Sequence, residues 1–266
     1  MPERTLISKI DRATKVLSDL QPVLIAVSGG IDSRFLAEIA KREGMQFGAL
    51  FFSGAQTTPA ERKFAYHVLA ELNRPFYVLK DFPLIGLKDS ADNKLRCYFC
   101  KQYLFSRAWQ VAFRHGYASL AEGSNASDRG QHRPGRRALN ELKVASPLDS
   151  AGLQKDEIRS LARYLGLRFP EQPSRPCLLT RFPYGYLPDI EELHQLGKAE
   201  DILCAMGFTD FRLRMVKKDS FLLQLSLAED KLWSRSKDQA LFFLKDLGLS
   251  VLKVDISENV SGYYDK

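Results

Sequence analysis

The segment Ser28-Gly29-Gly30-Ile31-Asp32-Ser33 has the residue types of a phosphate-binding loop. Two adjacent glycines let the backbone take positive φ values and approach an anion closely. The apolar run at 23–27 predicts a buried central strand before the loop, and the pattern at 31–42 predicts a helix whose N-terminus points at it. A carboxylate at Asp32 can hold Mg²⁺ against a bound pyrophosphate. The candidate phosphate-binding residues are Ser28, Gly29, Gly30, Asp32 and Ser33.

Polar or aromatic residues also follow two other predicted strands. Phe52 and Ser53 end the apolar run at 47–52, and Gly123 belongs to the Glu-Gly-Ser-Asn sequence that ends a strand predicted at 117–122. Ligands of a doubly wound sheet bind outside the carboxyl ends of its strands. We therefore expect Phe52 and Ser53 to wall an adenine and Gly123 to face the nucleotide. Phe51 fits this wall or the core equally well.

The cysteines form a second group of chemically active residues. Cys97 and Cys100 make a C-x-x-C pair at the start of a predicted helix. Cys177 lies in a proline- and arginine-rich segment, where the charges of Arg175 and Arg181 would favour an attacking thiolate.

These residues must be positioned by alternating strands and helices. Strands are predicted at 23–27, 47–52, 76–79 and 117–122, and helices at 3–20, 31–42, 58–72, 97–115 and 155–165. This alternation predicts an α/β fold with a doubly wound parallel sheet.

Prolines become frequent after residue 170, which marks a junction. Beyond it we predict a smaller α+β domain, with helices at 190–205 and 229–247 and strands at 211–216, 221–225 and 251–255. The predicted domains are therefore 1–170, for nucleotide binding, and 171–266, for the junction loop and for substrate binding or oligomerisation.

The composition suits an anionic ligand. The chain has 266 residues, of which 39 are Lys or Arg and 32 are Asp or Glu. The basic cluster at 129–137 lacks interleaved aromatics, so nucleotide phosphates are a more economical partner than nucleic acid. No apolar run approaches the length of a membrane span, and four cysteines in such a chain do not make a disulfide scaffold. We expect a cytoplasmic protein without membrane contact, in which Cys204 is a core residue.

The loop at 28–33 resembles the PP-loop of N-type ATP pyrophosphatases, which implies cleavage of ATP between its α and β phosphates. Further segments match one family within this superfamily, in order along nearly the whole chain. They are Cys-Tyr-Phe-Cys-Lys at 97–101, Glu-Gly-Ser-Asn-Ala-Ser-Asp at 122–128, Arg-Pro-Gly-Arg-Arg-Ala at 133–138, Ser-Pro-Leu at 146–148, the segment 173–185 around Cys177, and Phe-Arg-Leu-Arg at 211–214. Together they resemble the LarE family of ATP-dependent sulfur transferases of nickel-pincer nucleotide synthesis.

The resemblance implies a reaction and roles for its residues. ATP would adenylylate a carboxylate of pyridinium-3,5-biscarboxylic acid mononucleotide, a cysteine thiolate would displace AMP, and C–S cleavage would leave a thiocarboxylate. Cys177 matches the sulfur-donor position, and Arg181 and Glu200 fall in the substrate site. Arg212 and Arg214 match a pair that contacts anionic groups. On a strand both would share one face and could clamp a phosphate, although a solvated strand face is the alternative.

The cysteine number departs from the sacrificial members of the family, in which one cysteine suffices. Cys97, Cys100 and Cys177 could instead hold a [4Fe–4S] cluster with one open iron, as in some related thiolases. Both modes remain open. Two other functions also remain: a PP-loop tRNA thiolase or other AMP-forming ligase, and a non-catalytic ATP-sensing module. We expect a homo-oligomer.

Overall fold

The structure, a computed structural model, describes residues 4–80, 93–129, 134–258, 260 and 262–264. These residues form two compact units, the first within 1–54, 63–87 and 94–174 and the second within 55–62, 88–93 and 175–266. The domains predicted at 1–170 and 171–266 stay a prediction, because compactness does not show that either part folds alone.

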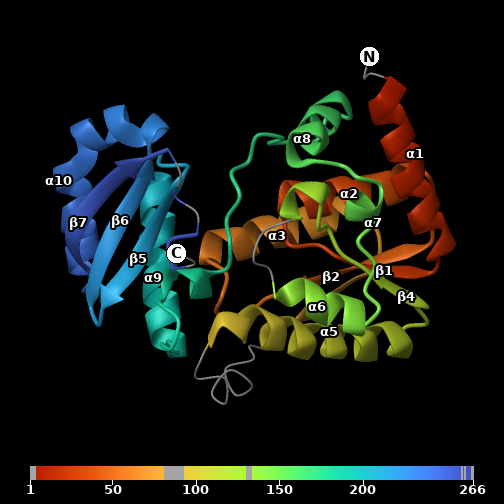
Figure 1. Cartoon of the computed structure of the whole chain (residues 1–266), viewed down its shortest axis with the longest axis horizontal. Helices are drawn as coiled ribbons and strands as arrows, with labels where there is room; N and C mark the ends of the chain where they lie inside the picture. The colour runs from red at the N-terminus through yellow and green to blue at the C-terminus, as the bar shows by residue number, and fades with distance from the viewer. Residues whose placement is uncertain (1–3, 81–92, 130–133, 259, 261, 265–266) are drawn as a thin grey trace. The chain divides into compact units, whose positions relative to one another are not determined.

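A four-stranded, all-parallel sheet is the centre of the first unit (Figure 1). Its strands are β1 (Val23–Ala26), β2 (Phe47–Phe52), β3 (Phe76–Leu79) and β4 (Ser119–Ala121), in the order β3-β2-β1-β4. The central strand is β1, which pairs with β2 on one side and β4 on the other. The predicted parallel α/β sheet is confirmed. Since β1 and β4 are neighbours, the segments that follow them leave the same edge of the sheet.

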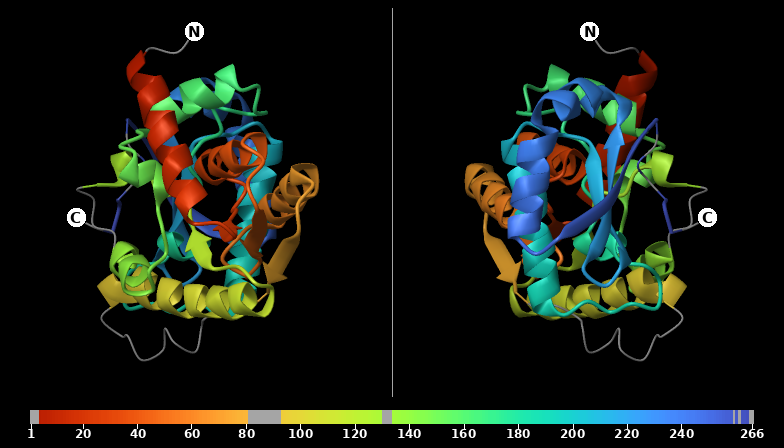
Figure 2. Two further views of the ribbon diagram at one scale, coloured as in Figure 1. Left: turned by 90° about the vertical axis from the view of Figure 1, so that its right-hand side faces the viewer. Right: turned by 90° about the vertical axis from the view of Figure 1, so that its left-hand side faces the viewer.

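Helices cover both faces of this sheet, as Figures 1 and 2 show. They are α1 (Arg4–Asp19), α2 (Ile31–Arg42), α3 (Pro59–Leu72), α5 (Arg96–Arg114), α6 (Gly135–Glu141), α7 (Pro147–Ser150) and α8 (Lys155–Tyr164). Helices α1 and α2 lie on one face, and α5 and α6 lie on the other. The short helices α6 and α7 were not predicted, because neither is long enough to show a helical repeat of apolar residues.

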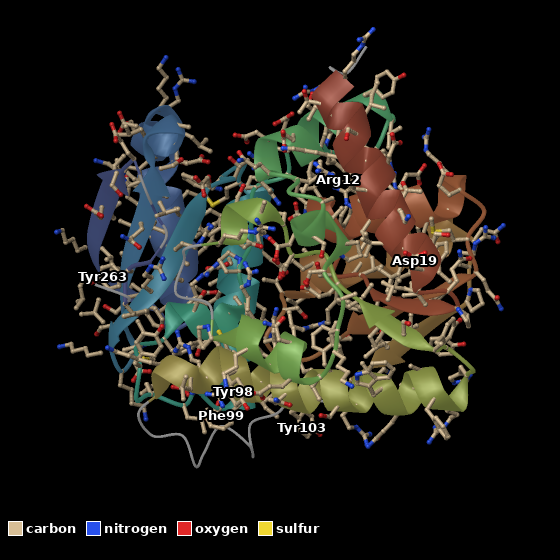
Figure 3. All side chains as sticks on the ribbon, turned by 45° about the vertical axis from the view of Figure 1, so that its right-hand side comes forward. Arg12, Asp19, Tyr98, Phe99, Tyr103 and Tyr263 are labelled. Carbon is tan, nitrogen blue, oxygen red and sulfur yellow. The ribbon has the colours of Figure 1, made fainter. Side chains whose placement is uncertain are left out.

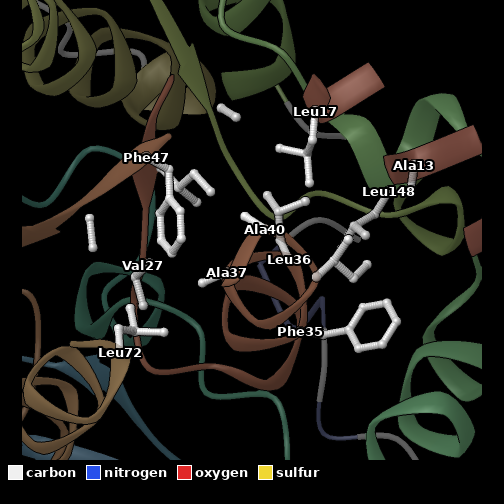
Figure 4. Packing of buried hydrophobic residues seen from close by; sticks show 14 of the residues in the cluster. Ala13, Leu17, Val27, Phe35, Leu36, Ala37, Ala40, Phe47, Leu72 and Leu148 are labelled. Atoms are coloured by element: carbon white, nitrogen blue, oxygen red, sulfur yellow. The ribbon is translucent and has the colours of Figure 1, made fainter. Parts of the chain in front are cut away.

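The side chains of β1 point alternately to the two faces of the sheet and so contribute to two separate apolar clusters. Val23 and Ile25 belong to the apolar cluster that includes Ala13 of α1 and Phe35 of α2, shown in Figure 4. Leu24 points to the opposite cluster, with Phe105 of α5. A strand that is buried on both faces carries apolar side chains along its whole length. The polar residues therefore lie just after its last residue.

The second unit contains a three-stranded sheet in the order β5-β6-β7. Its strands are β5 (Phe211–Lys217), β6 (Ser220–Ser226) and β7 (Ser250–Ser257), and its helices are α9 (Ile190–Ala205) and α10 (Asp230–Asp246). Strands β5 and β6 pair antiparallel, whereas β7 returns through α10 to pair parallel with β6. Residues 55–62, which include the first turn of α3, belong to this unit.

No helix among the described residues combines the length and apolar character needed to cross a membrane.

Candidate active site

The loop after β1 is closed by its own hydroxyl groups. The backbone N–H of Ser28 donates to Ser33 Oγ at 3.2 Å, and Ser33 Oγ donates to the Gly30 carbonyl at 3.0 Å. Gly29 has φ +85°, a conformation that residues with a Cβ rarely adopt. Gly30 is extended at the N-cap of α2, and no side chain of the described residues caps that helix N-terminus. The loop therefore presents a helix start toward the position expected for phosphate.

The segment after β4 packs tightly on this loop. A Cβ added to Gly123 would lie 2.8 Å from the backbone nitrogen of Ser33 and 3.0 Å from its Cα. Beside it, the Glu122 carboxylate accepts hydrogen bonds from Ser124 and, at 2.6 Å, from Ser146 Oγ. A glycine is thus needed at 123 for the two segments to approach each other.

Asp32 lies in the first turn of α2 and is paired with a residue far away in the sequence. Its Oδ2 accepts a hydrogen bond from Lys155 Nζ, and about a fifth of each side chain is exposed. Its Oδ1 is buried and has no hydrogen-bond partner among the described residues. A carboxylate oxygen is a preferred ligand of Mg²⁺, so Asp32 fits the predicted metal-binding role once Lys155 moves aside.

The two phenylalanines at the end of β2 lie in different surroundings. Phe51 is 2% exposed and belongs to the α2-side core cluster, so it packs in the core. Phe52 is half-buried and its ring lies 5.2 Å from that of Phe105. The backbone N–H of Ser53 donates to Leu79 at 2.7 Å.

Cys97 and Cys100 lie one turn apart at the start of α5. Cys97 is exposed and Cys100 is half-buried. The same helix start carries Tyr98, Phe99 and Tyr103, labelled in Figure 3. Tyr98 donates to Glu141 of α6 at 2.6 Å, which fixes the orientation of this turn.

In the second unit, Cys177 caps a short 3₁₀ turn, Leu178–Arg181. Its carbonyl accepts hydrogen bonds from the N–H and the hydroxyl of Thr180, at 2.9 and 2.8 Å. The following N–H, of Leu178, donates to the Gln56 carbonyl at 2.9 Å. Cys177 is half-buried, and its backbone is held on both sides.

Arg181, which ends the same turn, forms a buried ion pair with Glu200 of α9. Its Nε and one terminal nitrogen lie 2.6 and 3.1 Å from the two carboxylate oxygens. The backbone N–H of Leu213 adds a third donor at 3.4 Å. Burial alone would raise the pKa of Glu200, but the charge of Arg181, with Arg175 and Arg212, lowers it below its ordinary value.

Arg212 and Arg214 lie beside this pair on β5. Each is 3% exposed, so the alternative of a solvated strand face is wrong. Burial, followed by the charge of Arg181, lowers the pKa of each to about 10. The guanidinium of Arg214 donates to Gln224, to the Thr180 carbonyl and to the Val260 carbonyl.

The last arginine of the group contacts the fourth cysteine. Arg175 donates to the thiol of Cys204, which is half-buried near the end of α9. Burial raises the pKa of Cys204 to about 11, although Arg175 opposes that rise. Cys204 is therefore only partly in the apolar setting that the sequence predicted.

The second unit thus contains a dense charged group, which we call the arginine cluster. Its members are Arg175, Arg181, Arg212, Arg214, Glu61 and Glu200. Guanidinium groups outnumber carboxylates, so the cluster suits an anionic ligand. The substrate-site residues expected from the sequence, Arg181, Glu200, Arg212 and Arg214, lie together here.

The predicted residues divide between the units. Ser28, Gly29, Gly30, Asp32, Ser33 and Gly123 lie together in the first unit, as do Cys97 and Cys100, whereas Cys177 belongs to the second. Within the described residues, no three His, Cys, Asp or Glu side chains are grouped to hold a metal ion. A cluster shared by Cys97, Cys100 and Cys177 stays a prediction.

Sequence reasoning missed Lys155. A lysine in the first turn of a helix opposes the helix dipole, and that mismatch could have drawn attention to it.

Comparison with known proteins identifies relatives. The chain is 31% identical over 208 residues to an uncharacterised protein of Synechocystis, covering 78% of each chain. It is 29% identical over 220 residues to pyridinium-3,5-bisthiocarboxylic acid mononucleotide synthase of Lactiplantibacillus plantarum, covering 79% of this chain and 77% of that one. An uncharacterised protein of Methanocaldococcus jannaschii is 29% identical over 181 residues, or 68% and 69% of the two chains. No protein-family model matches the chain.

Proposed function

Because the chain belongs to the LarE family, we propose that it is an ATP-dependent sulfur transferase acting on pyridinium-3,5-biscarboxylic acid mononucleotide. The reaction adenylylates a carboxylate of that mononucleotide, releases pyrophosphate, and converts the activated carboxylate into a thiocarboxylate with release of AMP. The relative from Lactiplantibacillus plantarum supports this proposal, since its name describes a synthase of the bisthiocarboxylic product.

The observation that carries the ATP-dependent step is the loop after β1. Its Gly29 turn, its serine hydroxyls and the N-terminus of α2 suit a PP-loop that binds pyrophosphate. Asp32 offers its unpartnered Oδ1 as a Mg²⁺ ligand. Bound Mg²⁺ would neutralise charge that develops on the leaving pyrophosphate. Phe52, Ser53 and Gly123 are proposed to contact the nucleotide, from the two strands that flank β1.

The arginine cluster supports an anionic substrate. Glu200 holds Arg181 in one orientation, and Arg212 and Arg214 add two guanidinium groups from one strand. A mononucleotide carries a phosphate and carboxylates, which are the groups that guanidinium donors recognise best. We assign Arg181, Arg212, Arg214 and Glu200 to substrate binding.

The transferred sulfur is supplied in one of two modes, from the Cys177 thiol or from a cluster-bound sulfide. In the sacrificial mode the Cys177 thiolate attacks the acyl adenylate and AMP leaves. A β-elimination then removes the Cα proton of Cys177 to a base and breaks its Cβ–S bond, which leaves a thiocarboxylate on the substrate and dehydroalanine in the chain. In the alternative mode Cys97, Cys100 and Cys177 would hold a [4Fe–4S] cluster, which would supply a bound sulfide instead. The pair Cys97 and Cys100 lies one turn apart on one helix, a spacing that lets both thiols serve one cluster.

The function is tested by incubating the protein with ATP, Mg²⁺ and the mononucleotide. Formation of AMP and a product heavier by the replacement of oxygen with sulfur is expected. Asp32→Ala should abolish mononucleotide-dependent AMP formation while the protein stays folded, because the metal-binding carboxylate is lost. The proposal is overturned if the chain instead binds tRNA tightly in low salt and thiolates it. It is also overturned if the chain binds ATP without forming AMP.

The cysteine modes are separated by variants at the C-x-x-C pair. In the sacrificial mode, Cys97→Ala and Cys100→Ala keep one turnover per chain, and Cys177 becomes lighter by the mass of H₂S. In the cluster mode, each substitution removes iron and activity together, and the wild-type chain turns over repeatedly with sulfide while Cys177 stays intact. Iron analysis after anaerobic purification and mass spectrometry of the intact chain distinguish the two.

A cytoplasmic location suits this chemistry, because a reducing compartment keeps the thiols free. We also propose a homo-oligomer, which light scattering of the purified chain would test.

A further inference from the structure

The pair of Lys155 and Asp32 links two distant segments at the phosphate loop. Lys155 is the first residue of α8, and its ammonium group donates to Asp32 Oδ2 in the first turn of α2. The remaining carboxylate oxygen, Oδ1, is buried without a partner in the described part of the chain. The loop's one predicted metal ligand is therefore covered by a cation that belongs to the protein.

The pair is not needed to hold α8 in place. A capping box joins Gln154 and Glu157 at the start of that helix, and Glu157 also accepts both hydrogen bonds of the Lys9 ammonium group, at 2.6 and 2.7 Å. In addition, the backbone N–H of Lys155 donates to Ser127 Oγ at 2.9 Å. The helix start is thus fixed by backbone, cap and a separate ion pair.

A lysine at position 155 destabilises the start of α8 unless its ammonium group interacts with another group. A cation in the first turn of a helix opposes the helix dipole. Its side chain reaches the loop in which the backbone of Ser33 lies too close to Gly123 for a Cβ at that position. The Asp32 carboxylate alone would repel an incoming triphosphate, whereas its pairing with Lys155 leaves the loop without that net negative charge.

From this arrangement we propose that Lys155 is a phosphate-binding residue, which holds Asp32 in the free protein and moves to a phosphate oxygen of ATP when Asp32 takes Mg²⁺. The inference rests on the proposed ATP-dependent function. Lys155 keeps the Asp32 carboxylate oriented and compensates its charge before ATP arrives. After ATP binds, its ammonium group contacts the phosphate chain, and Asp32 becomes free for the metal.

The test measures binding rather than turnover. Isothermal titration calorimetry with ATP and with inorganic pyrophosphate, in excess Mg²⁺, is carried out on four full-length proteins: the wild type, Asp32→Asn, Lys155→Met and the double variant. We expect Lys155→Met to weaken binding of both ligands by about ten- to a hundred-fold, the usual effect of one lost charge-assisted contact. The loss should persist in the Asp32→Asn background, where the ion pair is already broken. Lys155→Arg should restore most of the affinity.

Lys9→Met is the matched control, because it removes an ion pair at the same helix start without touching the loop. It should leave ligand affinity unchanged. The proposal is overturned if Lys155→Met has no effect in the Asp32→Asn background, which would mean that Lys155 serves only as a partner for Asp32. It is also overturned if Lys9→Met weakens binding equally, or if the wild type binds neither ligand.

The proposed sulfur transfer can fail separately. If ATP binding depends on Lys155 but adding the mononucleotide does not cause AMP to form from ATP, the proposed function is wrong and this inference still holds.

Discussion

Arg181 and Glu200 form a two-point ion pair in which the side chains are 1% and 2% exposed. The pair joins the turn that follows Cys177 to helix α9, across 19 positions of the sequence. Since Glu200 also accepts the Leu213 N–H, one carboxylate orders three segments of the second unit.

Removing one partner of this pair should be costly. Glu200→Gln leaves the Arg181 charge buried and uncompensated, which typically destabilises a protein by about 3–5 kcal/mol. Urea denaturation followed by circular dichroism measures the change. Glu141→Gln is the matched control, because its pair with Arg137 lies at the surface and should not shift the midpoint. Equal stability of Glu200→Gln and the wild type would contradict the prediction.

The same carboxylate should make stability depend on pH. The pKa of Glu200 is lowered in the folded chain from an ordinary value of 4.5. Its contribution is therefore complete above that value and is lost as the pH falls through the lower, folded pKa. The difference in unfolding free energy between wild type and Glu200→Gln should shrink as the pH falls below about 4.5. A constant difference from pH 7 to pH 3 would contradict this assignment.

The thiol of Cys204 should be slow to react. Burial raises its pKa to about 11, and the thiolate is the reactive form. At pH 8, iodoacetamide should therefore modify exposed Cys97 well before Cys204. Peptide mass spectrometry of a time course measures the order, and unfolding in urea should remove the difference. Early labelling of Cys204 in the folded chain would show that its thiol is accessible and ionised.

A side chain at Gly123 should disturb the phosphate loop. In Gly123→Ala the new Cβ would meet the backbone of Ser33 at 2.8 Å, and backbone cannot move as a side-chain end can. Strain of about 1–3 kcal/mol in the loop would weaken ATP binding by about five- to 150-fold. Gly135→Ala is the control, because its closest contact is the flexible Lys101 side chain. Unchanged ATP affinity in Gly123→Ala would mean that the loop is not the nucleotide site.

Elements with strong local signals were predictable. Helix α2 begins and ends at Ile31 and Arg42, as the glycines before it and the periodicity within it indicated. Helix α3 begins at Pro59 after Thr58, which caps it through Glu61. In both cases the residues that fix the boundary are adjacent in the chain, so the sequence carries the information directly.

Contacts between distant residues were not predictable. Nothing near Lys155 reveals that its partner is Asp32, 123 positions earlier, or that Arg214 donates to Thr180. The sequence indicated that Arg212 and Arg214 share a strand face, but not that this face is buried. Burial depends on residues that only the folded chain brings together, and periodicity cannot report it when both faces of a strand are covered.

Three hydrogen bonds hold the main chain at Cys177. The Leu178 N–H donates to the Gln56 carbonyl, and the N–H and the hydroxyl of Thr180 donate to the Cys177 carbonyl. None of these three bonds uses the sulfur atom, so a chain that had given up its sulfur would keep them. Spent and unused molecules would share these main-chain contacts, and the mass of the intact chain is the property that distinguishes them.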